Sequence, residues 1–103
     1  MSDLQFENDD VQRHLWADEA GNVLADKAVK DIIVFSGLIR GGRAPDPTFI
    51  ERTLEFGAKS DPAHWTNALH LIKTAFDANG PAPDEQEGFD RIAAAIERGL
   101  KSA

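Results

Sequence analysis

The chain has 103 residues and a formal net charge of −7, a length that fits one domain and is too short for two ordinary ones. Hydrophobic residues make up 42%, as in average globular proteins, so we expect the chain to fold. It contains no cysteine, which excludes disulfides, thiolate metal sites and iron–sulfur clusters. The acidic start "MSDLQFENDD" and the absence of a long apolar run predict neither export nor membrane insertion, so a cytoplasmic location is expected.

Charge is distributed unevenly along the chain. Residues 1–26 hold seven acids and one base, residues 27–76 hold five acids and seven bases, and residues 77–103 hold six acids and three bases. An acidic N-terminal quarter repels nucleic acid and anionic membranes, and the weakly basic middle does not overcome that repulsion. The sequence therefore predicts no direct binding to nucleic acid or membrane.

The N-terminal segment, residues 1–24, is the least determined part, and its order in isolation is left open. Asp10 could cap a helix through "VQRHLWADEA", whereas Gly-Asn between short apolar stretches in "WADEAGNVL" predicts a short β-hairpin. Trp16, with Phe6 nearby, is an aromatic residue in an acidic segment without clear core periodicity. It either closes the end of a helical bundle or serves as an anchor for a partner.

Residues 26–40 are predicted to form a helix that is apolar nearly all round. One face carries Ala28, Ile32, Phe35 and Ile39, while Val34 and Leu38 fall elsewhere. The run "DIIVF" alone is also compatible with a buried strand, and periodicity does not separate the two. An all-round apolar helix is either buried in the middle of a bundle or covered on a second face by a partner.

The stretch "RGGR", residues 40–43, ends this helix. Gly41 or Gly42 suits a left-handed helix end, and Arg40 lies where a cation meets the negative end of the helix dipole. A phosphate-binding loop would need a Lys-Ser or Lys-Thr pair, or the spaced glycines of a dinucleotide fold after a strand, and neither is present. A turn is therefore favoured, with the guanidinium groups of Arg40 and Arg43 as candidate contacts for an acidic partner.

Three further helices are predicted in the second half of the chain. Asp46 and Pro47 begin one that places Phe49, Ile50, Thr53, Leu54 and Phe56 on one side. Ser60 or Asp61 caps the next, which ends at Asn79 and Gly80 with an apolar stripe of Trp65, Leu69, Ile72 and Phe76, widened by Ala68, Leu71 and Ala75. The last begins at a cap by Asp84 and buries Phe89, Ile92, Ala93, Ile96 and Leu100.

Residues that could carry chemistry are few. Asp10, His14 and Asp18 would share a face if residues 10–20 were helical, which permits a metal site, but a solvated acidic face is favoured. His64 and His70 are six residues apart and do not share a helix face, so each is expected to be structural or exposed. Ser36 has no histidine nearby in sequence, and its hydroxyl is expected to bond to the preceding helical turn.

The helices predicted at residues 47–58 and 61–79 invite comparison with a helix-turn-helix. The second of them offers Lys73 as its only cation, so an antiparallel helical hairpin is favoured over a DNA reader.

The sequence thus predicts one all-α domain over residues 1–103, a small bundle of four to five helices with a short N-terminal β-hairpin as an option. The leading hypothesis is a non-enzymatic interaction module without cofactor or metal. It would bind another protein, basic or itself nucleic-acid-binding, through an apolar helix face with an acidic rim, and a sharper version is a mimic of nucleic acid. A homodimer is an alternative occupant of the surplus apolar surface, and a metal-dependent or small-molecule enzyme is the alternative function. The candidate partner-binding residues are Phe6, Trp16, Arg40 and Arg43.

Overall fold

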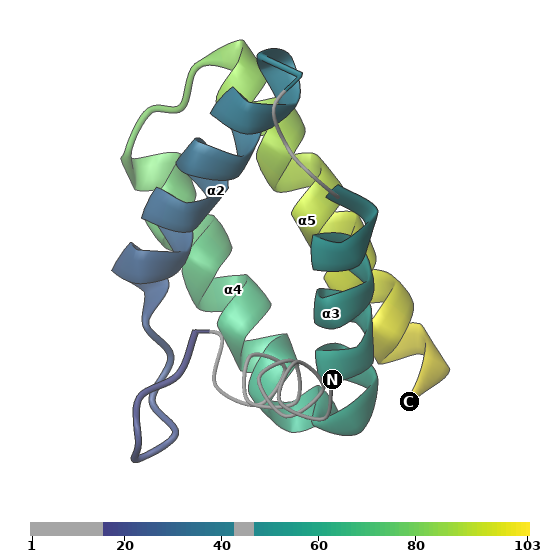
Figure 1. The fold of residues 1–103 in the computed structure, drawn as a ribbon. Helices are drawn as coiled ribbons and strands as arrows, with labels where there is room; N and C mark the ends of the chain where they lie inside the picture. Colours follow the sequence, from purple (N-terminus) through teal and green to yellow (C-terminus); the bar gives the residue numbers. More distant parts are fainter. Residues whose placement is uncertain (1–15, 43–46) are drawn as a thin grey trace.

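The computed structural model describes residues 16–42 and 47–103, and within them the chain forms four helices (Figure 1). They are α2 (Ala25–Arg40), α3 (Pro47–Ser60), α4 (Pro62–Ala78) and α5 (Pro83–Ser102). The all-α prediction is confirmed, and the run "DIIVF" belongs to a helix and not to a strand. None of the helices in the described ranges combines the length and apolar character needed to cross a bilayer.

Two helices, α4 and α5, organise the bundle. Each packs against the other three described helices, whereas α2 and α3 make few or no contacts with each other (Figure 1). The apolar residues of α5 recur at helical spacing, so the helix buries one continuous side that includes Phe89, Ile92 and Ile96.

The core lies among the helices and is rich in aromatic rings. Phe76 and Phe89 stack with centroids 4.7 Å apart, and Trp16 meets Trp65 at 5.8 Å in a tilted arrangement. These two ring pairs join α4 to α5 and to the segment before α2, so aromatic packing holds together parts of the chain that are far apart in sequence.

The apolar stripe predicted for α4 is mostly buried. Trp65, Ile72 and Phe76 are buried, and Leu69 is half-buried. The expectation that Leu71 widens the buried arc is wrong, because this side chain lies at the outer edge of α4 and is 38% exposed.

The buried side of α3 differs from the predicted one. Leu54 and Ala58 are buried and Ile50 is half-buried, so the helix turns this side to its neighbours. Phe49 and Phe56 were expected on the same side, but they are 49% and 53% exposed. The reason is helical geometry: the arc from Ile50 to Ala58 is already filled by small and aliphatic residues, and both phenylalanines fall beyond its edge.

Two glycines within α5 set how closely its neighbours approach. A Cβ at Gly88 would overlap Oγ of Ser36 on α2, and a Cβ at Gly99 would overlap the carbonyl oxygen of Glu55 on α3. Glycine within a helix costs stability relative to alanine, so close packing is the compensating gain. These two positions bring α2 and α3 against α5 at opposite ends of the helix.

Among the described residues the helix ends follow the predicted signals except at Asp84, and the predicted cap Asp46 lies outside the described residues. Asp61 accepts a hydrogen bond from the backbone N–H of His64 at 3.3 Å, as a cap of α4 should. Gly42 after α2 and Gly80 after α4 have φ of +67° and +61°, which glycine adopts without strain. The predicted cap at Asp84 is wrong, because α5 already begins at Pro83, and Oε1 of Glu85 accepts the N–H of Ala82.

The segment before α2 is a tight turn. Ala17 and Val23 form an isolated antiparallel bridge, with Gly21 at φ of +87° between them. Residues 16–24 therefore contain the turn that the hairpin interpretation predicted, and the helical alternative is wrong over residues 16–20 because they are not helical. The earlier part of that alternative lies outside the described residues.

Candidate functional site

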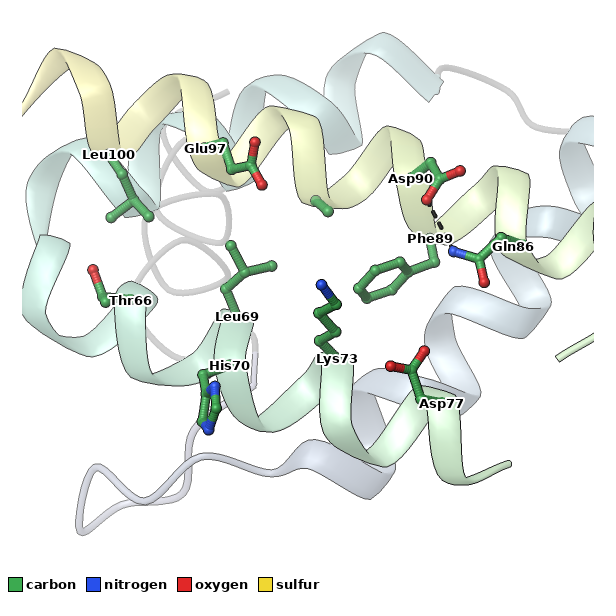
Figure 2. A pocket seen from close by; sticks show the side chains of 11 residues that line it. Thr66, Leu69, His70, Lys73, Asp77, Gln86, Phe89, Asp90, Glu97 and Leu100 are labelled. Carbon is green, nitrogen blue, oxygen red and sulfur yellow. Dashed lines mark hydrogen bonds between the residues drawn. The ribbon is translucent and has the colours of Figure 1, made fainter. Parts of the chain in front are cut away.

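A groove of about 460 Å³ lies between α4 and α5. Its apolar residues come from both helices and include Leu69, Phe89, Ala93 and Leu100. Figure 2 shows Leu69, Phe89 and Leu100 between the two helices, with Lys73 reaching from α4 toward Phe89. We call this surface the α4–α5 groove.

Acidic side chains border the α4–α5 groove. Asp77 lies on α4, Asp90 and Glu97 lie on α5, and all three are exposed. Lys73 is the only lysine or arginine among the lining residues, beside the three carboxylates. Among the described residues no ion pair joins Lys73 to these acids, and the one hydrogen bond on Asp90 comes from the neutral amide of Gln86. Within the described residues, no base forms an ion pair with the three acids of the rim.

Where α3 meets α5, in contrast, the acids are paired with bases. Nη2 of Arg91 lies 2.6 Å from Oε2 of Glu51, and Nε of Arg98 lies 2.9 Å from Oε1 of Glu55. Arg98 also lies 3.9 Å from Glu51, so the two helices share a short network of ion pairs. The acids of α3 that face α5 are therefore matched by bases, whereas the acids along the groove are not.

Trp16, a predicted partner-binding residue, lies in the core. Its ring is 2% exposed and packs on Trp65, and its indole N–H donates to Oδ2 of Asp31 at 3.1 Å. The same oxygen accepts a hydrogen bond from Nζ of Lys27 at 2.8 Å. The indole N–H of the buried ring thus has its hydrogen-bond partner within the bundle. In this structure the ring closes one end of the bundle and is not accessible to a partner.

The remaining predicted partner-binding residues are placed as follows. Arg40, in the last turn of α2, pairs with Asp84 at the start of α5 and keeps its side chain mostly exposed. This pair joins the C-terminal end of one helix to the N-terminal end of another, where both charges suit the helix dipoles. Phe6 and Arg43 lie outside the described residues.

Asp18 belongs to the optional metal site of Asp10, His14 and Asp18, over which the sequence favours a solvated acidic face. Its carboxylate accepts the backbone N–H of Asn22 at 2.8 Å and that of Ala20 at 2.9 Å, and these bonds, the one from Asn22 foremost, lower its pKa below the usual 3.8. Asp18 thus stabilises the turn, and because residues 16–20 are not helical, the spacing expected to align it with Asp10 and His14 does not reach it. Asp10 and His14 lie outside the described residues, and no cluster of three potential ligands occurs within the described ones.

Ser36 and the two described histidines have structural surroundings. Oγ of Ser36 donates to the carbonyl of Ile32 at 2.9 Å, as predicted for a helical serine. His64 meets Trp65 edge to face, with centroids 5.5 Å apart. His70 is exposed beside the α4–α5 groove.

Sequence reasoning did not identify the α4–α5 groove. Phe89, Ala93 and Leu100 were assigned to the core from their spacing, and the spacing is correct. Ala93 is the smallest of the apolar residues that line the groove. Spacing within one helix does not show which residues of a neighbouring helix lie opposite, so no signal in the sequence indicated the groove.

Comparison with protein-family models, with curated proteins and with solved structures found no match to this chain. The arrangement of the described residues is therefore the basis for assigning a function.

Proposed function

We propose that this protein is a small interaction module that binds a basic segment of another protein in the α4–α5 groove. The observation that carries the proposal is the combination of an apolar lining with three exposed acids that no base neutralises in the described structure. An amphipathic helix laid in such a groove buries its apolar face and places its basic side chains against the rim.

The chemistry of the rim favours a basic partner over an acidic one. Asp77, Asp90 and Glu97 attract cations at distance, and the whole chain, at −7, adds to that field. Charges of this kind mainly raise the association rate and make it sensitive to salt, while the apolar contacts hold the complex. A nucleic-acid-binding protein is one source of such a segment, since its basic surface is complementary to phosphate and carboxylate alike.

Affinity capture from native lysate tests the proposal with matched variants. In the groove variant, Asp90→Asn and Glu97→Gln remove two rim charges. In the control variant, Asp26→Asn and Glu19→Gln make the same chemical changes at exposed positions away from the groove. We expect the wild type and the control to retain the same protein partner at low salt and release it as salt screens the charges.

The groove variant is expected to retain about tenfold less of that partner, because two complementary charges are lost at once. Far-UV circular dichroism would verify that both variants are folded. Equal retention by the groove variant and the control would contradict the proposal. Retention of nothing by the wild type would contradict it as well.

A further inference from the structure

The two edges of the α4–α5 groove differ in charge. On the α5 edge, Asp90 and Glu97 are exposed, and the described lining residues of this helix include no lysine or arginine. On the α4 edge, Lys73 is exposed, and Asp77 follows it about one helical turn later. Figure 2 shows Lys73 extending from this edge toward Phe89. The groove is therefore acidic along α5 and mixed in charge along α4.

The acids of the α5 edge have the spacing of two helical turns. Asp90 and Glu97 are seven residues apart, about 10.5 Å along the axis, and project from the same side of α5. Two basic residues seven apart on a partner helix have the same spacing, so both can meet these acids when that helix lies along the groove. Apolar side chains three and four residues apart on the partner would then cover Phe89, Ala93 and Leu100.

Lys73 gives the α4 edge a different preference. Within the described residues its ammonium group takes part in no ion pair. A basic side chain of the partner placed beside it would be repelled, whereas a carboxylate there would be attracted. A helix that is basic on both edges therefore meets repulsion on the α4 side of the groove.

On the basis of the function proposed for the α4–α5 groove, we infer that its partner is an amphipathic helix of mixed charge. The apolar face lies in the groove, two basic residues seven apart face Asp90 and Glu97, and a carboxylate on the opposite edge faces Lys73. Such a segment keeps a net positive charge, so the net charge of −7 on the chain still attracts it. Lys73 disfavours helices that are basic on both edges and is thus the residue that determines specificity.

The test titrates two designed helical peptides into the ¹⁵N-labelled full chain. Both carry leucines on one face and two lysines, seven residues apart, on one edge of that face. The mixed peptide has a glutamate on the other edge, and the basic peptide has a lysine at that position. Amide shifts on α4 and α5 locate the bound peptide, and the titration curves give its dissociation constant.

The substitution Lys73→Gln should act in opposite directions on the two peptides. It should weaken binding of the mixed peptide about threefold, because an exposed ion pair is lost. It should strengthen binding of the basic peptide about threefold, because a repulsion of similar size is removed. Loss of one positive charge from the chain would by itself strengthen both complexes, since both peptides are basic overall. Weaker binding of the mixed peptide therefore reports a local contact with Lys73.

The matched control is Lys30→Gln, because Lys30 is exposed on α2 and does not line the groove. It removes the same charge and should strengthen both complexes slightly and equally. If Lys73→Gln strengthened both complexes as well, the mixed-charge inference would be overturned while the proposed function would stand. If neither peptide shifted the amides of the groove, both would be overturned.

Two other occupants of the groove have outcomes of their own, and neither is expected. Spermidine is a polycation without an apolar face, and binding as tight as that of the mixed peptide would show that charge alone is recognised. Shifts of the groove amides as the concentration of the unliganded chain is raised would show that a second copy occupies the groove. Either result would overturn an amphipathic helix as the partner.

Discussion

Helix α5 packs closely against α3 on one side and borders a groove with α4 on the other. Toward α3 it offers Gly99, so that the backbone of Glu55 comes close, and its arginines neutralise the acids of α3. Toward α4 it leaves a groove of about 460 Å³ lined by Ala93, with Asp90 and Glu97 unpaired by any base in the described structure. The α3–α5 interface therefore combines close packing with paired charges, whereas the α4–α5 side combines a groove with acids that no described base pairs.

Adding one methyl group to the α3–α5 interface should lower the free energy of unfolding more than any other change considered below. In Gly99→Ala the new Cβ would overlap the carbonyl oxygen of Glu55 and lie 2.7 Å from Cβ of Ala58, so α3 must move away. We expect a loss of about 3 kcal/mol in the free energy of unfolding, the upper range for overpacking. Urea denaturation followed by circular dichroism measures it.

Gly37→Ala on α2 is the matched control, because nothing lies within 4 Å of the position that its Cβ would occupy and its φ is not positive. The added methyl group should instead stabilise the helix by up to about 1 kcal/mol. If Gly99→Ala were as stable as Gly37→Ala, the close approach of α3 and α5 would be refuted.

A second prediction concerns charge pairing on the two sides of α5. Glu51→Gln leaves Arg91 and Arg98 without their shared carboxylate at a site where the Glu51 side chain is only 18% exposed. We expect a loss of about 1 kcal/mol, more than an exposed pair contributes. Glu97→Gln on the groove side should change stability by less than about 0.5 kcal/mol. Thermal denaturation compares the two variants, and equal losses would remove the distinction between the two sides.

A third prediction fills the groove. Ala93 lies in the groove lining and is half-buried, so Ala93→Leu adds its side chain to existing space. The free energy of unfolding should therefore stay within about 0.5 kcal/mol of the wild type, while partner capture falls. Stability measured by urea denaturation, together with retention in the capture experiment, checks both parts. A destabilisation as large as that of Gly99→Ala would mean that the groove is closed.

The smallest expected change in stability concerns Asp18, whose charge lies on neither side of α5. Hydrogen bonds from the backbone of Asn22 and its neighbours hold the pKa of Asp18 below 3.8. Its ionised form therefore stabilises the folded state above that value, and the contribution is lost as pH falls through the lowered pKa. Asp18→Asn should be less stable than the wild type near neutral pH, with the difference shrinking below pH 3.8. A constant difference in urea midpoint from neutral to acidic pH would contradict this.

The helices could be predicted well from the sequence because their signals are local. Pro47, Pro62 and the cap at Asp61 mark helix starts, and Gly42 and Gly80 mark the ends of helices. Which side of a helix is buried depends on its neighbours, so the exposure of Phe49 and Phe56 was not predictable from α3 alone.

The candidate surfaces were harder to predict. Trp16 is enclosed by Trp65 and Asp31, residues that the fold brings to it from two other segments. The groove is lined by residues of both α4 and α5, and spacing within one helix does not show which residues of another helix lie beside it. Composition gives the net negative charge of the chain but not which acids lie along the groove.

Whether the α4–α5 groove binds a basic helix is best decided by chemical-shift mapping of the full chain with a designed amphipathic helical peptide that carries leucines on one face and lysines beside them. We expect the amides of Leu69, Lys73, Ala93 and Glu97 to shift, and Asp90→Asn/Glu97→Gln to weaken the interaction while Asp26→Asn/Glu19→Gln does not. Shifts spread over the surface without preference for α4 and α5 would show that the groove is not a site for basic segments. Equal shifts at the groove with a control peptide that carries glutamates in place of the lysines would show the same.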